Sequence, residues 1–416
     1  MKRAAPRSAG RWLVVGWIGV GLLMAVLVAV NPTHFTSIDS GYYLQSAENL
    51  LDGRGYVVLE DGHYTWNGVF PIGYSGLIAL FSFITSLPVL LSSKVINWLA
   101  IGISTWLWYK RLGAVRTGWL LSIWLLGSFL RIATYTWSET VFLVLLAEVV
   151  WAFHQQLAHP SIRHTLILLV LGLLLFGVRY VGGYIFGLLG AIALGHQLWP
   201  QKVFSWLGGS LPQTAGNRLT LVTISGLVGM GFYFWLNSRF TDSPYGGERF
   251  HEAETGGSLL PLFLLALVNE VLLIRDFISD ESNTLAWIGV GIQVTWLLAL
   301  INVFKRIPPA AGSRDTQRLQ KLLVSFGGLY LIILFALRIF SPFAGPTARL
   351  MAPFTFCMLF AAMLWLTEPG RQLWEKTFRP FWIVLLVCSW LQLFPQVDVS
   401  RKLRQVQQQF FSPSIP

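Results

Sequence analysis

The sequence contains few charged residues and few cysteines. Asp, Glu, Lys and Arg make up 12% of its 416 residues, while hydrophobic residues make up 54%. The cysteines, Cys357 and Cys388, both lie within apolar runs, so we predict neither a disulfide framework nor a cysteine metal site. The sequence also lacks a P-loop, a low-complexity tract and the inverted repeat that many transporters carry. So little charge in so apolar a chain excludes an ordinary soluble protein.

Long apolar runs dominate the chain and indicate an all-α polytopic membrane protein. They repeatedly reach the length that crosses a bilayer, and many of the 19 Trp lie near their ends, as in interfacial aromatic belts. We predict about eleven transmembrane helices, a cytoplasmic N-terminus and no large soluble domain. Two further apolar segments, 69–87 and 259–274, are assigned as juxtamembrane, although either could be counted as a span.

The predicted topology accounts for the net charge of +11. Most Lys and Arg fall in the predicted cytoplasmic loops, and most Asp and Glu fall in the outer loops. The positive-inside rule accounts for this bias, so no nucleic-acid partner is predicted. Because the two juxtamembrane segments are placed partly to satisfy that rule, the bias is no independent test of the number of spans.

The same assignment divides the chain into six parts. The predicted parts are the N-terminus with the first span (1–30), the first outer loop with juxtamembrane helices (31–90), a core membrane module (91–236), a second outer loop (237–283), the C-terminal membrane helices (284–394) and an outer tail (395–416). The first outer loop carries the most distinctive sequence.

That loop contains a short helical pattern beginning near Asp39. Apolar residues recur at helical spacing after it, and two glycines then supply a stop. Asp39 occupies the position of an N-cap, where a carboxylate accepts bonds from free backbone amides. We therefore predict a short helix lying on the membrane surface. The residues of this pattern are Tyr43, Ala47, Leu50, Leu51, Gly53 and Gly55.

The loop resembles the first outer loop of the GT-C membrane glycosyltransferases. It has an acidic residue before Gly-Tyr-Tyr, then Ala, Asn-Leu-Leu and Gly-x-Gly-Tyr, and later Pro71-Ile-Gly73-Tyr74. The protein O-mannosyltransferase and aminoarabinose-transferase-like bacterial enzymes are the most similar. The resemblance covers the N-terminal half well and the remainder loosely. It implies a GT-C fold and a catalytic base at Asp39, whereas the residues alone allow Asp39 to be only a helix cap.

A second acidic residue follows from the same resemblance. Trp137-Ser138-Glu139 opens a predicted span, and family members carry an acidic residue in this outer loop. Glu139 would then orient the acceptor or hold a metal. If a divalent cation such as Mg or Mn is required, Asp39 and Glu139 are its expected ligands. The alternative is that Glu139 is an ordinary carboxylate favoured by the helix dipole.

Arginines near the outer ends of spans are the candidate donor phosphate ligands. Family members often carry Arg-Tyr after the fifth span, here Arg179-Tyr180, and a late Arg followed by Pro, here Arg349. The tyrosine usual after the late Arg is Leu350. Arg249, in the polar second outer loop, is the third candidate. A guanidinium fork suits phosphate, although such arginines can also snorkel or be solvated.

The resemblance implies transfer of a sugar from a polyprenyl-phosphate donor to an acceptor hydroxyl, with inversion. The acceptor would be a protein, lipid or glycan at the periplasmic face of a bacterial inner membrane. The expected substrate-loop residues are Tyr42, Tyr43, Tyr74 and Tyr180.

Two other classes stay open. A transporter or flippase of lipid-linked sugars would explain the spans, but transport usually places paired charges at mid-membrane, where Glu148 is nearly alone in the sequence. An inactive relative acting as an assembly scaffold is the other.

Overall fold

The structure is a computed structural model that describes residues 7–199, 213–241, 243–244, 256–272, 284–305, 313–340, 347–390 and 393. Over these residues it is almost entirely helical. A single antiparallel hairpin pairs β1 (Val57–Glu60) with β2 (His63–Trp66). The helices are α1 (Arg7–Val30), α2 (Ile38–Leu51), α3 (Gly73–Thr85), α4 (Val89–Leu112), α5 (Ala114–Ile123), α6 (Gly127–Thr134), α7 (Glu139–Ala158), α8 (Ile162–Val178), a 3₁₀ turn (Tyr180–Gly183), α9 (Tyr184–Leu198), α10 (Gln213–Phe240), α11 (Gly256–Leu272), α12 (Thr284–Lys305), α13 (Arg314–Phe340), α14 (Ala348–Leu366) and α15 (Gln372–Trp390).

The predicted polytopic membrane class is confirmed. Seven helices of the described residues are long and apolar enough to cross a membrane: α1, α4, α7, α9 with its preceding turn, α10, α13 and α14. Each coincides with a predicted span. α8, α12 and α15 occupy three more of the predicted spans but are not among these seven helices. The number eleven therefore stays a prediction.

One predicted span, 118–133, is broken. α5 and α6 differ in direction by 75°. At the break, the N–H of Gly127 donates to Ser389 Oγ of α15 (2.9 Å), and a Cβ added at Gly127 would lie 2.0 Å from the Ser389 carbonyl oxygen. The segment is therefore bent, which the sequence did not indicate because an apolar run indicates burial and not direction. Whether the two helices together form one span stays a prediction.

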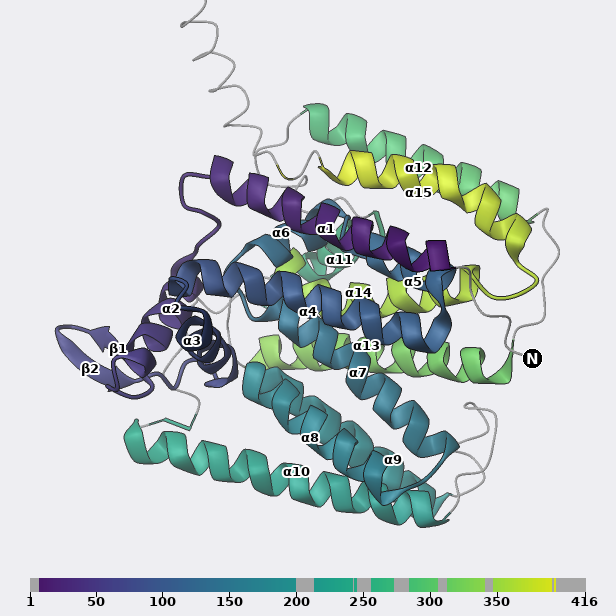
Figure 1. Ribbon diagram of the computed structural model, residues 1–416. Coiled ribbons are helices and arrows are strands. Elements are labelled where there is room, and N and C mark those ends of the chain that lie inside the picture. The colour runs from purple at the N-terminus through teal and green to yellow at the C-terminus, as the bar shows by residue number, and fades with distance from the viewer. Residues whose placement is uncertain are drawn as a thin grey trace, which may run out of the picture.

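The long helices run side by side, with α2, α3 and the hairpin gathered at one end of the bundle (Figure 1). α7 is the central helix and packs against α4, α8, α13 and α14. Nearly all of its side chains are buried. The first residue of α7 therefore marks the point where the bundle core meets the end that carries α2.

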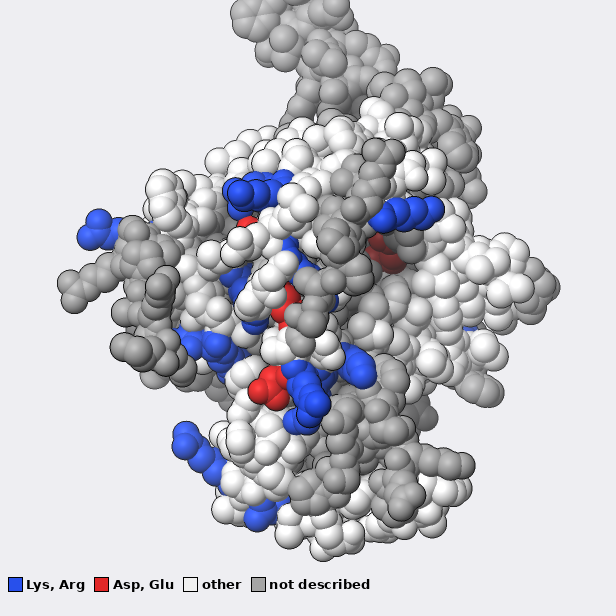
Figure 2. Space-filling model, turned by 90° about the vertical axis from the view of Figure 1, so that its right-hand side faces the viewer, with Lys and Arg blue, Asp and Glu red and all other residues white. Residues whose placement is uncertain are grey.

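The opposite end of the bundle is basic. Figure 2 looks onto it and shows many Lys and Arg side chains with few Asp and Glu. The last turn of α4, with Lys110 and Arg111, and the start of α13 at Arg314 lie at this end.

The predicted short helix after the first span is α2, but its N-cap is Ser37 and not Asp39. The Ser37 hydroxyl accepts from the N–H of Ser40, and the Ser40 hydroxyl accepts from the N–H of Ser37. This reciprocal pair is a capping box. Asp39 lies in the first turn, where its carboxylate is not needed for capping and contacts another part of the chain.

The two segments assigned as juxtamembrane form short helices. α3 has 13 residues, fewer than a span needs. α11 packs against two late helices: Phe263 stacks on Phe335 of α13 at 4.0 Å, and Glu270 accepts a hydrogen bond from Thr355 of α14. α3 is thus shorter than a span, and α11 lies against α13 and α14. The juxtamembrane position of both segments stays a prediction.

We predict that Gly73→Ala destabilises the protein. A Cβ at Gly73 would lie 2.4 Å from the carbonyl oxygen of Gly177, so α3 and the end of α8 would be forced apart. Overpacking of this kind costs about 1–3 kcal/mol. Gly76→Ala is the matched control on the same helix, because its Cβ would meet only Ile72 at 3.8 Å. Thermal unfolding in detergent compares them, and equal melting temperatures would contradict the prediction.

Candidate active site

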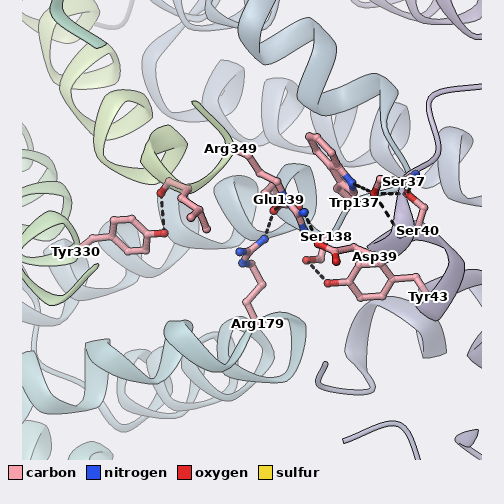
Figure 3. Close-up of polar contacts among 11 residues, drawn as sticks. Ser37, Asp39, Ser40, Tyr43, Trp137, Ser138, Glu139, Arg179, Tyr330 and Arg349 are labelled. Carbon is pink, nitrogen blue, oxygen red and sulfur yellow. Dashed lines mark hydrogen bonds and ion pairs between the residues drawn. The ribbon is translucent and has the colours of Figure 1, made fainter. Parts of the chain in front are cut away.

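Four charged side chains from distant parts of the chain meet at the end of the bundle that carries α2 (Figure 3). Arg349 donates through Nη1 to Asp39 Oδ2 and through Nε to Glu139 Oε1. Arg179 forms an ion pair with the same Glu139 oxygen. The order Asp39, Arg349, Glu139, Arg179 alternates in sign, so the formal charges cancel. We call these four residues the charged cluster.

Burial differs sharply within the charged cluster. Glu139 is 1% exposed, Arg179 16%, Arg349 18% and Asp39 34%. Asp39 is therefore the carboxylate that a solvent-borne or lipid-borne group can reach. The second oxygen of Glu139, Oε2, is buried and has no hydrogen-bond partner among the described residues.

Electrostatics keep Arg179 charged despite its burial. Burial, the largest single influence, lowers the pKa of Arg179, but favourable interactions led by the Glu139 carboxylate and including Tyr43 and Tyr330 together outweigh it, and the pKa is raised above its ordinary value. Burial also raises the pKa of Tyr43, to about 12. Tyr43 is thus a neutral phenol near pH 7, hydrogen-bonded to Ser138 at 3.0 Å.

Polar side chains of α4 hold the loop that carries Glu139. Three of them face this loop, although they lie inside an apolar predicted span. The contacts are Ser93 Oγ with Thr136 Oγ1 (2.8 Å), Lys94 Nζ to the carbonyls of Phe35 (3.0 Å) and Thr134 (2.8 Å), and Asn97 Nδ2 to the carbonyls of Ala133 and Tyr135 (both 3.0 Å). Sequence reasoning missed these residues. The available signal was their spacing, which places polar groups on one face of a membrane helix.

Two aromatic residues orient Arg349. Its guanidinium lies over the Trp137 ring, 4.4 Å from the ring centroid. The Tyr330 hydroxyl donates to the carbonyl of Leu350, the residue after Arg349, at 2.9 Å. Neither Tyr330 nor Trp137 was among the predicted site residues, because nothing in the local pattern relates them to Arg349.

The predicted substrate-loop tyrosines separate into two groups. Tyr43 adjoins the charged cluster through Ser138, and Tyr74 packs edge-on against Tyr43 at 5.1 Å. Tyr42 donates to Glu60 of the hairpin, at 3.2 Å, and Tyr180 donates to the Gly68 carbonyl, at 2.8 Å. The last two therefore tie loops together beside the site. Their roles toward a substrate stay predictions.

Arg249, the third predicted phosphate ligand, lies outside the described residues. The charged cluster therefore brings together Asp39, Glu139, Arg179 and Arg349, which the sequence analysis singled out from four separate segments. The catalytic and binding roles assigned to them are taken up below.

The described residues do not form a divalent cation site. No group of three or more His, Cys, Asp or Glu side chains among them has an arrangement that could hold a metal. The two carboxylates predicted as ligands, Asp39 and Glu139, instead share Arg349, so a guanidinium lies where a bridging cation would have to lie. No step below is assigned to a metal.

A second buried ion pair lies deeper in the bundle. Glu148 accepts from Arg111 through both oxygens, at 2.8 and 2.5 Å, and the Arg111 guanidinium lies over the rings of Trp108 and Trp151. Glu148 is thus paired between helices α4 and α7.

Comparison with known proteins identifies the fold. No protein-family model matches the sequence, and no curated protein does. The structure is similar to ArnT from Cupriavidus metallidurans, whose crystal structure contains undecaprenyl phosphate, with 14% identity and a TM-score of 0.50 over 90% of this chain. It also matches the Archaeoglobus fulgidus oligosaccharyltransferase tethered to an acceptor peptide, with 12% identity and a TM-score of 0.46 over 92% of this chain. The matches cover 63% and 55% of those two chains, respectively.

The chain therefore has the fold of the GT-C membrane glycosyltransferases, as the sequence predicted. It spans somewhat less than two thirds of the length of ArnT. At this level of identity the similarity defines the fold, and the chemistry has to be argued from the charged cluster itself.

We predict that Glu139→Gln lowers the free energy of unfolding by about 3–5 kcal/mol, because it leaves two buried guanidiniums without their shared carboxylate. Denaturant titration in detergent measures this. Asp52→Asn is the control: it breaks an ion pair with Arg54 whose side chains are about half exposed, which is worth about 0–1 kcal/mol. Similar losses in the two variants would contradict the prediction.

Proposed function

We propose that the protein is a membrane glycosyltransferase that moves a sugar from a polyprenyl-phosphate donor to an acceptor hydroxyl. The single observation that carries the proposal is the charged cluster, in which an accessible carboxylate and a largely buried guanidinium are held together at the end of a GT-C fold. A donor that stays dissolved in the membrane requires an enzyme with its site at the membrane boundary.

Arg349 is suited to the donor phosphate. The contacts with Asp39 and Glu139 use two of its five N–H donors, so others remain for a phosphate oxygen. Arg179, held charged by Glu139, adds positive potential from the buried side. Arg249 is proposed as a third ligand on the strength of the sequence resemblance. Charge developing on the leaving phosphate would thereby be stabilised.

Asp39 is suited to the role of general base. One of its oxygens accepts from Arg349, which leaves the other to accept the proton of the acceptor hydroxyl. The hydroxyl oxygen then attacks the anomeric carbon from the face opposite the phosphate. The carbon–oxygen bond to the phosphate breaks, and its electron pair leaves with the polyprenyl phosphate. The product is inverted at the anomeric carbon.

The proposed orientation in the membrane follows from the charge of the basic end. We propose that the basic end shown in Figure 2 faces the cytoplasm, in line with the positive-inside rule. The charged cluster then faces the periplasm of a bacterial inner membrane. The acceptor there is a protein, lipid or glycan with a free hydroxyl.

We predict that Asp39→Asn lowers turnover by at least about a hundredfold, since positioned base catalysis is typically worth 10²–10⁴ in rate. Purified protein in lipid is given a panel of polyprenyl-phosphate sugars with candidate acceptors, and release of polyprenyl phosphate is measured. Asn keeps the size and one hydrogen-bond acceptor of Asp, so the fold is expected to persist.

Glu48→Gln is the control for this experiment. Glu48 is an exposed carboxylate on the same helix, α2, so the same chemical change should leave turnover unaltered. Near-wild-type turnover by Asp39→Asn would exclude Asp39 as the base. No release by well-folded wild-type protein with any donor would favour a transporter or a scaffold instead.

A further inference from the structure

We propose that Trp137 is a positioning residue of the transfer reaction, one that sets where Arg349 lies relative to the helix that carries Asp39. This rests on the proposed function. The indole contacts one partner of the Asp39–Arg349 ion pair and the helix that carries the other: Arg349 lies against its face, and Ser37 at the start of α2 is bonded to its edge (Figure 3).

The contact with Arg349 restricts how the guanidinium can turn. Its carbon lies 4.4 Å from the Trp137 ring centroid, while its nitrogens donate to Asp39 and Glu139. A cation over an aromatic face is attracted by the ring, more strongly where water is scarce. The indole therefore occupies the face of the guanidinium and leaves its N–H edge for carboxylates and phosphate.

The contact with α2 connects the same ring to Asp39. Trp137 Nε1 donates to Ser37 Oγ at 2.8 Å, and Ser37 is the N-cap of α2. Asp39 is only two residues along from this cap. Any shift of the indole would thus move the first turn of α2, and with it the proposed base, relative to Arg349.

The indole is itself held firmly. It stacks on Tyr135, with centroids 3.8 Å apart and planes 7° from parallel, and Asn97 holds the Tyr135 carbonyl. Ser138 and Glu139, which follow directly, bond to Tyr43 and to the two arginines. One short segment therefore fixes base and phosphate ligand together, and both need to be held within about 1 Å for efficient catalysis.

Two substitutions separate the two contacts. Trp137→Phe keeps an aromatic face for Arg349 but removes the N–H donor, so kcat should fall by about tenfold to a hundredfold with little change in KM for the donor. Trp137→Leu removes both contacts, so KM for the donor should also rise. A purely structural role would not produce a KM for the donor that is raised in Trp137→Leu but stays near the wild-type value in Trp137→Phe.

A double variant tests the bond to α2 directly. If Trp137 acts through Ser37, adding Trp137→Phe to Ser37→Ala should change kcat by less than about twofold. If kcat of the double variant instead falls by the product of the two single-variant effects, the indole does not act through this bond. Trp382→Phe is the matched control: its Nε1 also donates to a serine, Ser122, at 2.9 Å, but between α15 and α5. It should leave kcat and KM per folded enzyme unchanged.

The results distinguish this proposal from the proposed function. If the wild type releases polyprenyl phosphate and the Trp137 variants match Trp382→Phe in kcat and KM, the role of Trp137 is overturned and the proposed function stands. Absence of release by the wild type with every donor would overturn both proposals. Weaker binding of undecaprenyl phosphate by Trp137→Leu than by Trp137→Phe, measured without an acceptor, is the expected companion result.

Discussion

The whole arrangement depends on one carboxylate, Glu139, buried between two arginines. A buried charge is tolerated only if it is paired and hydrogen-bonded, and Glu139 gives each guanidinium its partner at the first residue of the central helix. Arg349 can then extend to Asp39 without leaving the buried carboxylate. The accessible part of the site, where we place the chemistry, is thus supported by the ion pairs of a carboxylate that is itself buried, Glu139.

The support continues outward from that point through α4 and the loop before α7. Lys94 and Asn97 fix backbone carbonyls of the loop, and Trp137 links the loop to the start of α2. The Lys94 and Asn97 side chains that make these contacts are buried, and they bind backbone carbonyls, which move less than side chains. The geometry around Asp39 therefore belongs to the scaffold and does not have to be created by a substrate.

The sequence allowed the class, the fold and the four charged residues to be predicted, but not their contacts. Arg349 and Asp39 are 310 residues apart, and no local pattern relates such positions. Ser37 and Asp39 are both favoured cap residues, so only the structure distinguishes the cap from the free carboxylate. The break before Gly127 was missed because hydropathy measures how apolar a run is, and the run itself is continuous.

The spacing of these residues along the chain also bears on how the protein is made. Asp39, Glu139 and Arg179 leave the ribosome well before Arg349, which lies on α14. Until α14 is inserted, Asp39 lacks the Arg349 guanidinium with which it pairs in the structure, and Glu139 has only Arg179 as its partner. The site is therefore completed late, and an incomplete chain in the membrane would carry the base without the residue proposed to receive the donor phosphate.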